Sequence, residues 1–222
     1  MIADLAEYAE RNQKTYDKMK ARYPDLHFIT LTILAGDYAN VPIADKAFED
    51  GMGWKDVVWS VLGSYSRMEW VLEKVLAGRI PPRDFYKELP HLWAMSDPDD
   101  TDPRFLQMWL KAFYLNGSGY LRDGRKMRSG TTLTVYRGQQ NEDGKFGLSW
   151  SLSHAVAERF ARGAWHRVPT EGVIYVAQVR RNSVMAYLTD RQEEEVIINP
   201  DRLRNPEVFA RIVRKESHGK EE

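Results

Sequence analysis

The chain has 222 residues, an apolar fraction of 43% and seven tryptophans, a composition typical of a folded globular protein with a sizeable core. Its 32 basic residues balance its 32 acidic residues, and neither half is a basic arm, so charge gives no strong signal for nucleic acid or an anionic membrane. The absence of cysteine excludes disulfides, thiolate nucleophiles and cysteine zinc sites, and the histidines show no metal-ligand spacing.

The amino terminus and the hydropathy of the chain indicate a cytoplasmic protein. Residues 1–10 contain acidic side chains where a signal peptide needs basic residues and an apolar run. No stretch approaches the roughly 20 apolar residues that cross a bilayer. We therefore expect a reducing compartment and no membrane partner.

The first 125 residues are predicted to be mostly helical. An apolar spacing of three to four residues predicts a first helix that stops at Tyr23-Pro24. A wide apolar stripe over 54–77 predicts one long continuous helix, which Gly78 ends and Pro81-Pro82 prevents from resuming.

A third helix is predicted to open at Asp102-Pro103, an N-cap followed by proline at the first helical position, and to stop at Asn116-Gly117. It follows the acidic tract 97–102. This tract lacks the glycine and the terminal glutamate of an EF-hand loop, so we interpret it as a capping linker and not as a calcium site.

The pattern changes near Thr131, where short β-branched runs begin. One helix, predicted over 154–161 with Ser153 as its cap, interrupts them. Helices first and strands afterwards indicate an α+β fold. The glycine-rich and charged stretch 116–130 places the expected boundary between a helical region, 1–125, and a second domain, 126–222. The predicted strands are 131–136, 172–180, 184–188, 195–198 and one near 208–214.

Polar side chains stand at the ends of three strand-like segments of the second domain. Taken singly they are ordinary features: an arginine at a turn, serines that face solvent, and a charged strand edge that discourages pairing. Their combination in this order and spacing is more specific. These residues are Arg137, Ser149, Ser151 and the run Glu193-Glu194-Glu195.

The ordered set resembles the Arg-Ser-Glu branch of the mono-ADP-ribosyltransferases, which includes clostridial-type toxins. The resemblance covers roughly residues 131–214 and implies a small two-sheet β-sandwich core, NAD as substrate and no metal. Tryptophan replaces the usual middle threonine of the family's Ser-Thr-Ser strand. The matching residues are Tyr136-Arg137 for the aromatic-arginine dipeptide, Ser149-Trp150-Ser151 for that strand, and Glu193-Glu194-Glu195 for a Glu-x-Glu running into an apolar strand.

The resemblance implies a role for each charged group. Cleavage between nicotinamide and ribose makes an oxocarbenium-like sugar, so the site needs negative charge at the ribose and a hold on the diphosphate. Glu195 is expected to stabilise the developing cation, and Ser149 to orient Glu195. Arg137 is expected to bind the diphosphate through its forked, always-charged guanidinium.

Three further residues are expected to contact the cofactor. The backbone of Gly138 can approach the nicotinamide amide because no Cβ intervenes. Ser151 lines the same site, and Phe160 is expected to stack on the nicotinamide ring. Trp165 and His166, in the loop that follows, are candidates for the surface that recognises the acceptor.

Glu193 lies two residues before Glu195, so on a strand the two side chains would face the same side. In the family the earlier glutamate engages an incoming arginine and accepts its proton. If Glu194 were the catalytic acid instead, Gln192 would be its partner and the acceptor would be a different residue. We prefer Glu195, because the apolar run begins directly after it.

Three functions follow as hypotheses. The first is a mono-ADP-ribosyltransferase that modifies a macromolecule, with protein arginine as the preferred acceptor. The second is an NAD glycohydrolase, and the third is a noncatalytic module with the same fold whose helical half binds a partner. Residues 1–125 would serve as an adaptor or specificity region, cover the active site, or resemble a second domain that holds no NAD. A toxin-like effector from a bacterium or a phage is the expected kind of protein.

Overall fold

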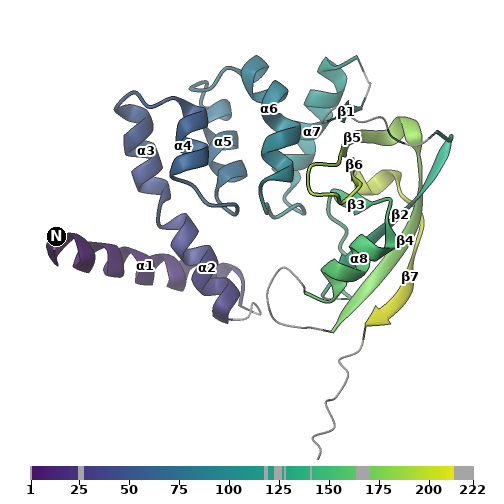
Figure 1. Ribbon diagram of the computed structural model, residues 1–222, viewed down its shortest axis with the longest axis horizontal. Helices are drawn as coiled ribbons and strands as arrows, with labels where there is room; N and C mark the ends of the chain where they lie inside the picture. Colours follow the sequence, from purple (N-terminus) through teal and green to yellow (C-terminus); the bar gives the residue numbers. More distant parts are fainter. Residues whose placement is uncertain are drawn as a thin grey trace, which may run out of the picture. The chain divides into compact units, whose positions relative to one another are not determined.

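The computed structural model describes residues 2–24, 28–117, 120–122, 127, 129–140, 142–163 and 171–212. The chain divides into two compact units, residues 1–98 and 99–222, and Figure 1 shows the helices and strands of each. Each unit has its own cluster of buried apolar residues. No helix within the described ranges is both long and apolar enough to cross a membrane.

The first unit is helical, as its composition predicts. Met19 of the first helix packs with Leu31 and Leu34 of the second in one buried cluster. The helices are α1 (Ile2–Arg22), α2 (Phe28–Tyr38), α3 (Val41–Glu49), α4 (Trp54–Ser60), α5 (Arg67–Leu76) and α6 (Pro82–Ala94). The first helix therefore ends where Tyr23-Pro24 predicts.

The prediction of one continuous helix over 54–77 is wrong, because the chain turns between α4 and α5. The buried carboxylate of Asp37 accepts backbone N–H groups from Gly63 (2.8 Å), Tyr65 (2.7 Å) and Ser66 (3.2 Å). A Cβ on Gly63 would overlap that carboxylate. Since an uninterrupted helix would need these N–H groups for its own ladder, a side chain from α2 decides the break.

The second unit joins two helices to a mixed sheet. Asp102 caps α7 as predicted, accepting the N–H of Arg104 (2.9 Å). Ser153 stands at the start of α8, but its side chain accepts no hydrogen bond from the described first turn, so the expected side-chain cap is absent. The helices are α7 (Pro103–Leu115) and α8 (His154–Ala161), with short 3₁₀ turns at Arg181–Ser183 and Pro200–Arg202.

The described strands form one seven-stranded sheet in the order β1-β5-β6-β3-β2-β4-β7, in which only β1 runs parallel to its neighbour. The α+β prediction agrees with this, but the expectation of two separate sheets does not. The strands are β1 (Leu121–Arg122), β2 (Thr132–Gln139), β3 (Ser149–Ser151), β4 (Gly172–Arg180), β5 (Val184–Leu188), β6 (Glu195–Ile198) and β7 (Arg204–Ile212).

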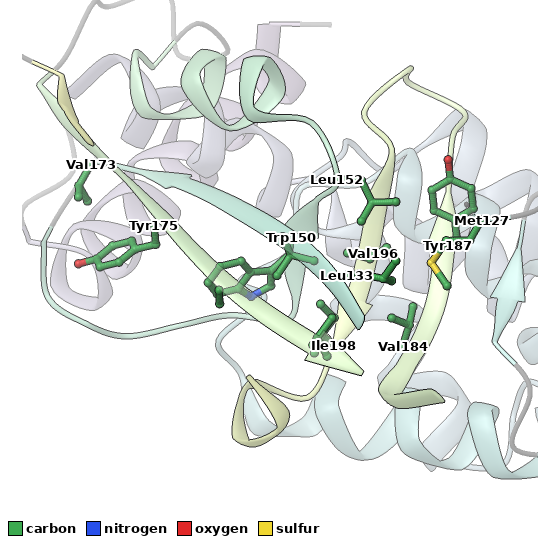
Figure 2. Close-up of a cluster of buried hydrophobic side chains, with 13 residues drawn as sticks. Met127, Leu133, Trp150, Leu152, Val173, Tyr175, Val184, Tyr187, Val196 and Ile198 are labelled. Carbon is green, nitrogen blue, oxygen red and sulfur yellow. The ribbon is translucent and has the colours of Figure 1, made fainter. Parts of the chain in front are cut away.

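The sheet nevertheless has two halves that share one core. Among the described residues, a single pair, Tyr136 opposite Ser151, joins β2 to β3. Figure 2 shows side chains from both halves meeting in one buried cluster, where Leu133 of β2 and Trp150 of β3 lie with Val196 of β6. The apolar runs that predicted the strands therefore supply this core from both sides of the join.

The boundary between the units lies earlier in the chain than expected. The expected boundary lies at 125/126, whereas the compact units divide between Pro98 and Asp99. Helix α7 consequently belongs with the sheet. The physical reason is a set of hydrogen bonds that Asp100 accepts from β2 and β3, described below.

Candidate functional site

The three segments that carry the polar motif are neighbours in the sheet. Strand β3 lies between β6 and β2, and Ser151 is opposite Tyr136 on one side and opposite Glu195 on the other. Segments that are far apart in sequence thus place the arginine, the serines and the glutamate within three adjacent strands.

Strands β2 and β3 separate directly beyond the pair of Tyr136 and Ser151, where Arg137 follows on β2 and Ser149 lies on β3. The backbone of Ser149 has side-chain partners there in place of a strand: its N–H donates to the carboxylate of Asp100 (2.9 Å), and its carbonyl accepts from Nη1 of Arg137 (2.7 Å). The ion pair of Arg137 and Asp100 therefore takes the place of backbone hydrogen bonds between β2 and β3. It provides partners for the N–H and the carbonyl of Ser149, which burial would otherwise leave without any.

The guanidinium of Arg137 is held from three sides. Nη1 and Nη2 contact the two carboxylate oxygens of Asp100 at 2.7 and 3.1 Å, and Nε donates to Oε1 of Gln139 (3.1 Å). The side chains of Arg137 and Asp100 are each only 15% exposed. Such a bidentate pair has the geometry in which arginine binds an anion most specifically.

Charges around Arg137 keep it ionised. Burial by itself lowers the pKa of its guanidinium, but the neighbouring Asp100 charge, with contributions from Glu195 and Asp143, raises that pKa above its ordinary value. Glu195 therefore lies within electrostatic reach of Arg137, and carboxylates outnumber the guanidinium at this point.

The side chains do not all leave the sheet on one face. Residues directly opposite each other in antiparallel strands share a face, so Tyr136, Ser151 and Glu195 lie together. Ser149, two residues before Ser151, has the same orientation. The side chain of Arg137 leaves β2 on the opposite face of the sheet. Its guanidinium then lies in the opening between β2 and β3, beside the Ser149 carbonyl. The hydroxyls and the acid thus share a face, while the arginine enters from the other side.

The hydroxyl of Ser151 is engaged within the protein. It donates to the carbonyl oxygen of Glu193 (2.6 Å) and accepts the N–H of Ser153 (3.0 Å), while Leu152 donates its N–H to the carbonyl of Glu194 (3.0 Å). These bonds hold the turn before β6 against the end of β3. The position of Ser151 therefore supports the glutamate run.

The expectation that Glu193 and Glu195 lie on one strand is wrong. Strand β6 begins at Glu195, and both Gln192 and Glu194 have positive φ angles, 58° and 45°, which break the alternation. Glu193 is buried, with 7% of its surface exposed. Glu195 is half-buried, and its charge acts on Arg137.

The missing Cβ of Gly138 admits a helix, and the expected approach of its backbone to a nicotinamide amide stays a prediction. A Cβ there would overlap the carbonyl oxygen of Ala157 and the backbone nitrogen of Ala161, both in α8. Phe160 on the same helix is 39% exposed. Trp165 and His166 lie outside the described residues.

Asp100 is the residue that the sequence pattern did not identify. It belongs to the tract interpreted as a capping linker, and Asp102 does cap α7. Asp100 is 37 residues from Arg137 and 49 from Ser149, so no local spacing connects them. The tract 97–102 contains more aspartates than one helix cap requires, and this excess was the sequence feature that pointed to a second role.

Comparison of the chain with protein-family models, with curated proteins and with solved structures found no match. Within the part of the chain that the structure describes, no group of three or more histidine, aspartate or glutamate side chains is placed to hold a metal ion.

Proposed function

We propose that this chain is an NAD-dependent mono-ADP-ribosyltransferase that transfers ADP-ribose to a macromolecular acceptor, with protein arginine preferred, and releases nicotinamide. The observation that supports this most is the adjacency of β2, β3 and β6, which places Arg137 within electrostatic reach of Glu195.

The chemistry requires negative charge beside the ribose as the glycosidic bond breaks. The bonding electrons leave with the nicotinamide, which departs neutral, and the ribose becomes cationic. We assign Glu195 to stabilise that cation, because a carboxylate preorganised beside the developing charge lowers the barrier. Ser149 lies on the same face and orients the acid.

We assign Arg137 to the opening between β2 and β3, which it organises by pairing with Asp100 and the Ser149 carbonyl. Its expected contact with the diphosphate stays a prediction, because Asp100 already binds both Nη groups of Arg137. Gly138 serves the site indirectly, because it lets α8, which carries Phe160, approach the sheet.

A second candidate, NAD glycohydrolase, has a specific observation in its favour. Glu193, which would engage an arginine acceptor, is buried and lies outside β6. Transfer to water needs no such carboxylate. Hydrolysis therefore remains the alternative, with the same role for Glu195.

Incubation with NAD that is radiolabelled in its adenylate half separates these functions. We expect nicotinamide release, together with label retained on macromolecules of a cell lysate and released by treatments that cleave arginine-linked ADP-ribose. Nicotinamide release with all label in free ADP-ribose would support the glycohydrolase. Equal nicotinamide release from the wild-type and Glu195→Gln proteins would contradict both.

A further inference from the structure

We infer that Asp100 is a positioning residue of this site, which holds the guanidinium of Arg137 in the opening between β2 and β3. This inference rests on the proposed function. It concerns a residue outside the three segments that carry the family resemblance, and it assigns that residue an effect on turnover through Arg137.

Asp100 makes contacts with both strands that border the opening. Its carboxylate accepts from Nη1 and Nη2 of Arg137 on β2, and from the backbone N–H of Ser149 on β3. Its own carbonyl oxygen accepts the N–H of Leu148 (3.2 Å). One residue therefore sets the separation of the two strands at this point.

The sequence around Asp100 is adapted to this position. A Cβ on Gly147 would overlap the carboxylate, so a glycine at 147 leaves the space that the Asp100 side chain occupies. Asp102, two residues after Asp100 in the chain, caps α7 and so fixes the backbone that follows Asp100. The space beside Gly147 and the capped helix therefore both constrain the Asp100 side chain.

The ion pair explains why the position of Arg137 depends on Asp100. With the side chains only 15% exposed, an uncompensated guanidinium would be costly, and it would move toward water or toward another acid such as Glu195. Such a movement would change the electrostatics at Glu195, whose charge already acts on Arg137. Asp100 therefore keeps the two catalytic-site charges at a set separation.

Asp100 could alternatively block the site by taking the place of a phosphate on the guanidinium fork. Its bonds to Ser149 and Leu148 argue against this role. Displacing its carboxylate would leave the backbone N–H of Ser149 without its acceptor, at a cost, while the carbonyl bond to Leu148 holds the backbone of Asp100 in place. The contacts favour a permanent positioning residue.

The test compares Asp100→Asn with Asp99→Asn in the full chain, measuring kcat and KM for nicotinamide release from NAD. Asp99 belongs to the same tract, is exposed, and bonds to Thr101. We expect Asp100→Asn to lower kcat by about 10- to 100-fold through misplacement of Arg137, with little change in KM, and Asp99→Asn to behave as wild type. An unchanged kcat, or a lower KM as expected on removal of a blocking group, would overturn the inference.

Gly147→Ala provides a second variant that keeps every charge. It displaces the carboxylate of Asp100, so we expect the same fall in kcat, and wild-type kcat would count against the inference. Circular dichroism establishes that each variant is folded before its kinetics are compared.

A double-mutant cycle distinguishes a failed inference from a failed function. Urea midpoints are measured for wild type, Asp100→Asn, Arg137→Gln and the double variant. We expect Asp100→Asn to lower the midpoint less when residue 137 is already glutamine. If the wild-type protein releases no nicotinamide, the proposed function fails. If Asp100→Asn lowers the urea midpoint equally with arginine and with glutamine at position 137, Asp100 does not hold Arg137 and the inference fails.

Discussion

At the residue scale, the chemistry of the candidate site depends on which glutamate of a run of three acts electrostatically on Arg137. Positive φ angles at Gln192 and Glu194 turn the backbone just before β6. Glu193 is consequently buried, while Glu195 begins the strand and acts on the guanidinium. The backbone of the turn, and not the spacing of the acids, separates the three carboxylates.

If the proposed function holds, exchange of Glu195 for glutamine is expected to lower kcat for nicotinamide release by about 100-fold or more, because it would remove the negative charge proposed to act on the ribose while keeping the shape of the side chain. Glu194→Gln is the matched control, and we expect kcat near that of wild type. Steady-state assays of nicotinamide release measure both. A loss confined to Glu194→Gln would move the catalytic position by one residue.

At the element scale, two contacts determine how helices are placed. Helix α8 lies against β2 and β4 (Figure 1). It comes close to them at Gly138 and Gly172, where a Cβ would overlap helix backbone. The turn between α4 and α5 is organised by the Asp37 carboxylate. In both cases an absent or distant side chain, not the propensity of the element itself, decides the geometry.

Gly138→Ala is expected to lower the free energy of unfolding by about 1–3 kcal/mol, because the added methyl forces α8 away from β2. Gly36→Ala is the comparison: Gly36 lies inside α2 with nothing within 4 Å of the position of a Cβ, so we expect a neutral or slightly stabilising effect. Urea denaturation measures both. Equal effects would mean that α8 does not depend on this close approach.

Asp37→Ala is expected to destabilise the first unit by about 1–3 kcal/mol or more, since backbone N–H groups of the turn lose their acceptor. Asp50→Ala removes an exposed carboxylate that pairs with Lys46, and we expect a change below about 0.5 kcal/mol. Hydrogen exchange at the amides of Gly63 and Tyr65 should rise in Asp37→Ala alone. Unaltered exchange there would show that the turn does not need this carboxylate.

At the scale of the whole molecule, the chain consists of two units whose boundary follows long-range hydrogen bonds. Residues 99–125 carry α7, β1 and Asp100, and all three belong with the sheet. Strand β1 pairs with β5, and Asp100 pairs with Arg137. A boundary placed at 125/126, where the composition changes, would therefore separate α7, β1 and Asp100 from the sheet they belong with.

A fragment of residues 99–222 is expected to unfold cooperatively in urea, whereas a fragment of residues 126–222 is expected to be markedly less stable. The shorter fragment lacks Asp100, so the largely buried Arg137 loses its compensating charge. Circular dichroism as a function of urea concentration measures the difference. Equal midpoints for the two fragments would place the boundary at 126.

Much of the fold was predictable from local sequence. The strands 172–180, 184–188 and 195–198 are confirmed at their predicted bounds, because β-branched runs between turn residues favour strands. Helix α7 begins after Asp102 and ends before Asn116-Gly117, since an aspartate cap, a first-turn proline and a glycine act on their own neighbours. By contrast, the separate helices α2, α3 and α6 did not emerge from the apolar spacing.

By itself the sequence determined most of the segments that form strands, and α7, and it identified the arginine, serines and glutamate that lie on the neighbouring strands β2, β3 and β6. Only the tertiary structure decided the break between α4 and α5, the burial of Glu193 and the pairing of Asp100 with Arg137. The physical reason is range: caps, prolines and β-branched residues act within a few positions, whereas a buried carboxylate binds groups 26 to 49 residues away once the chain has folded.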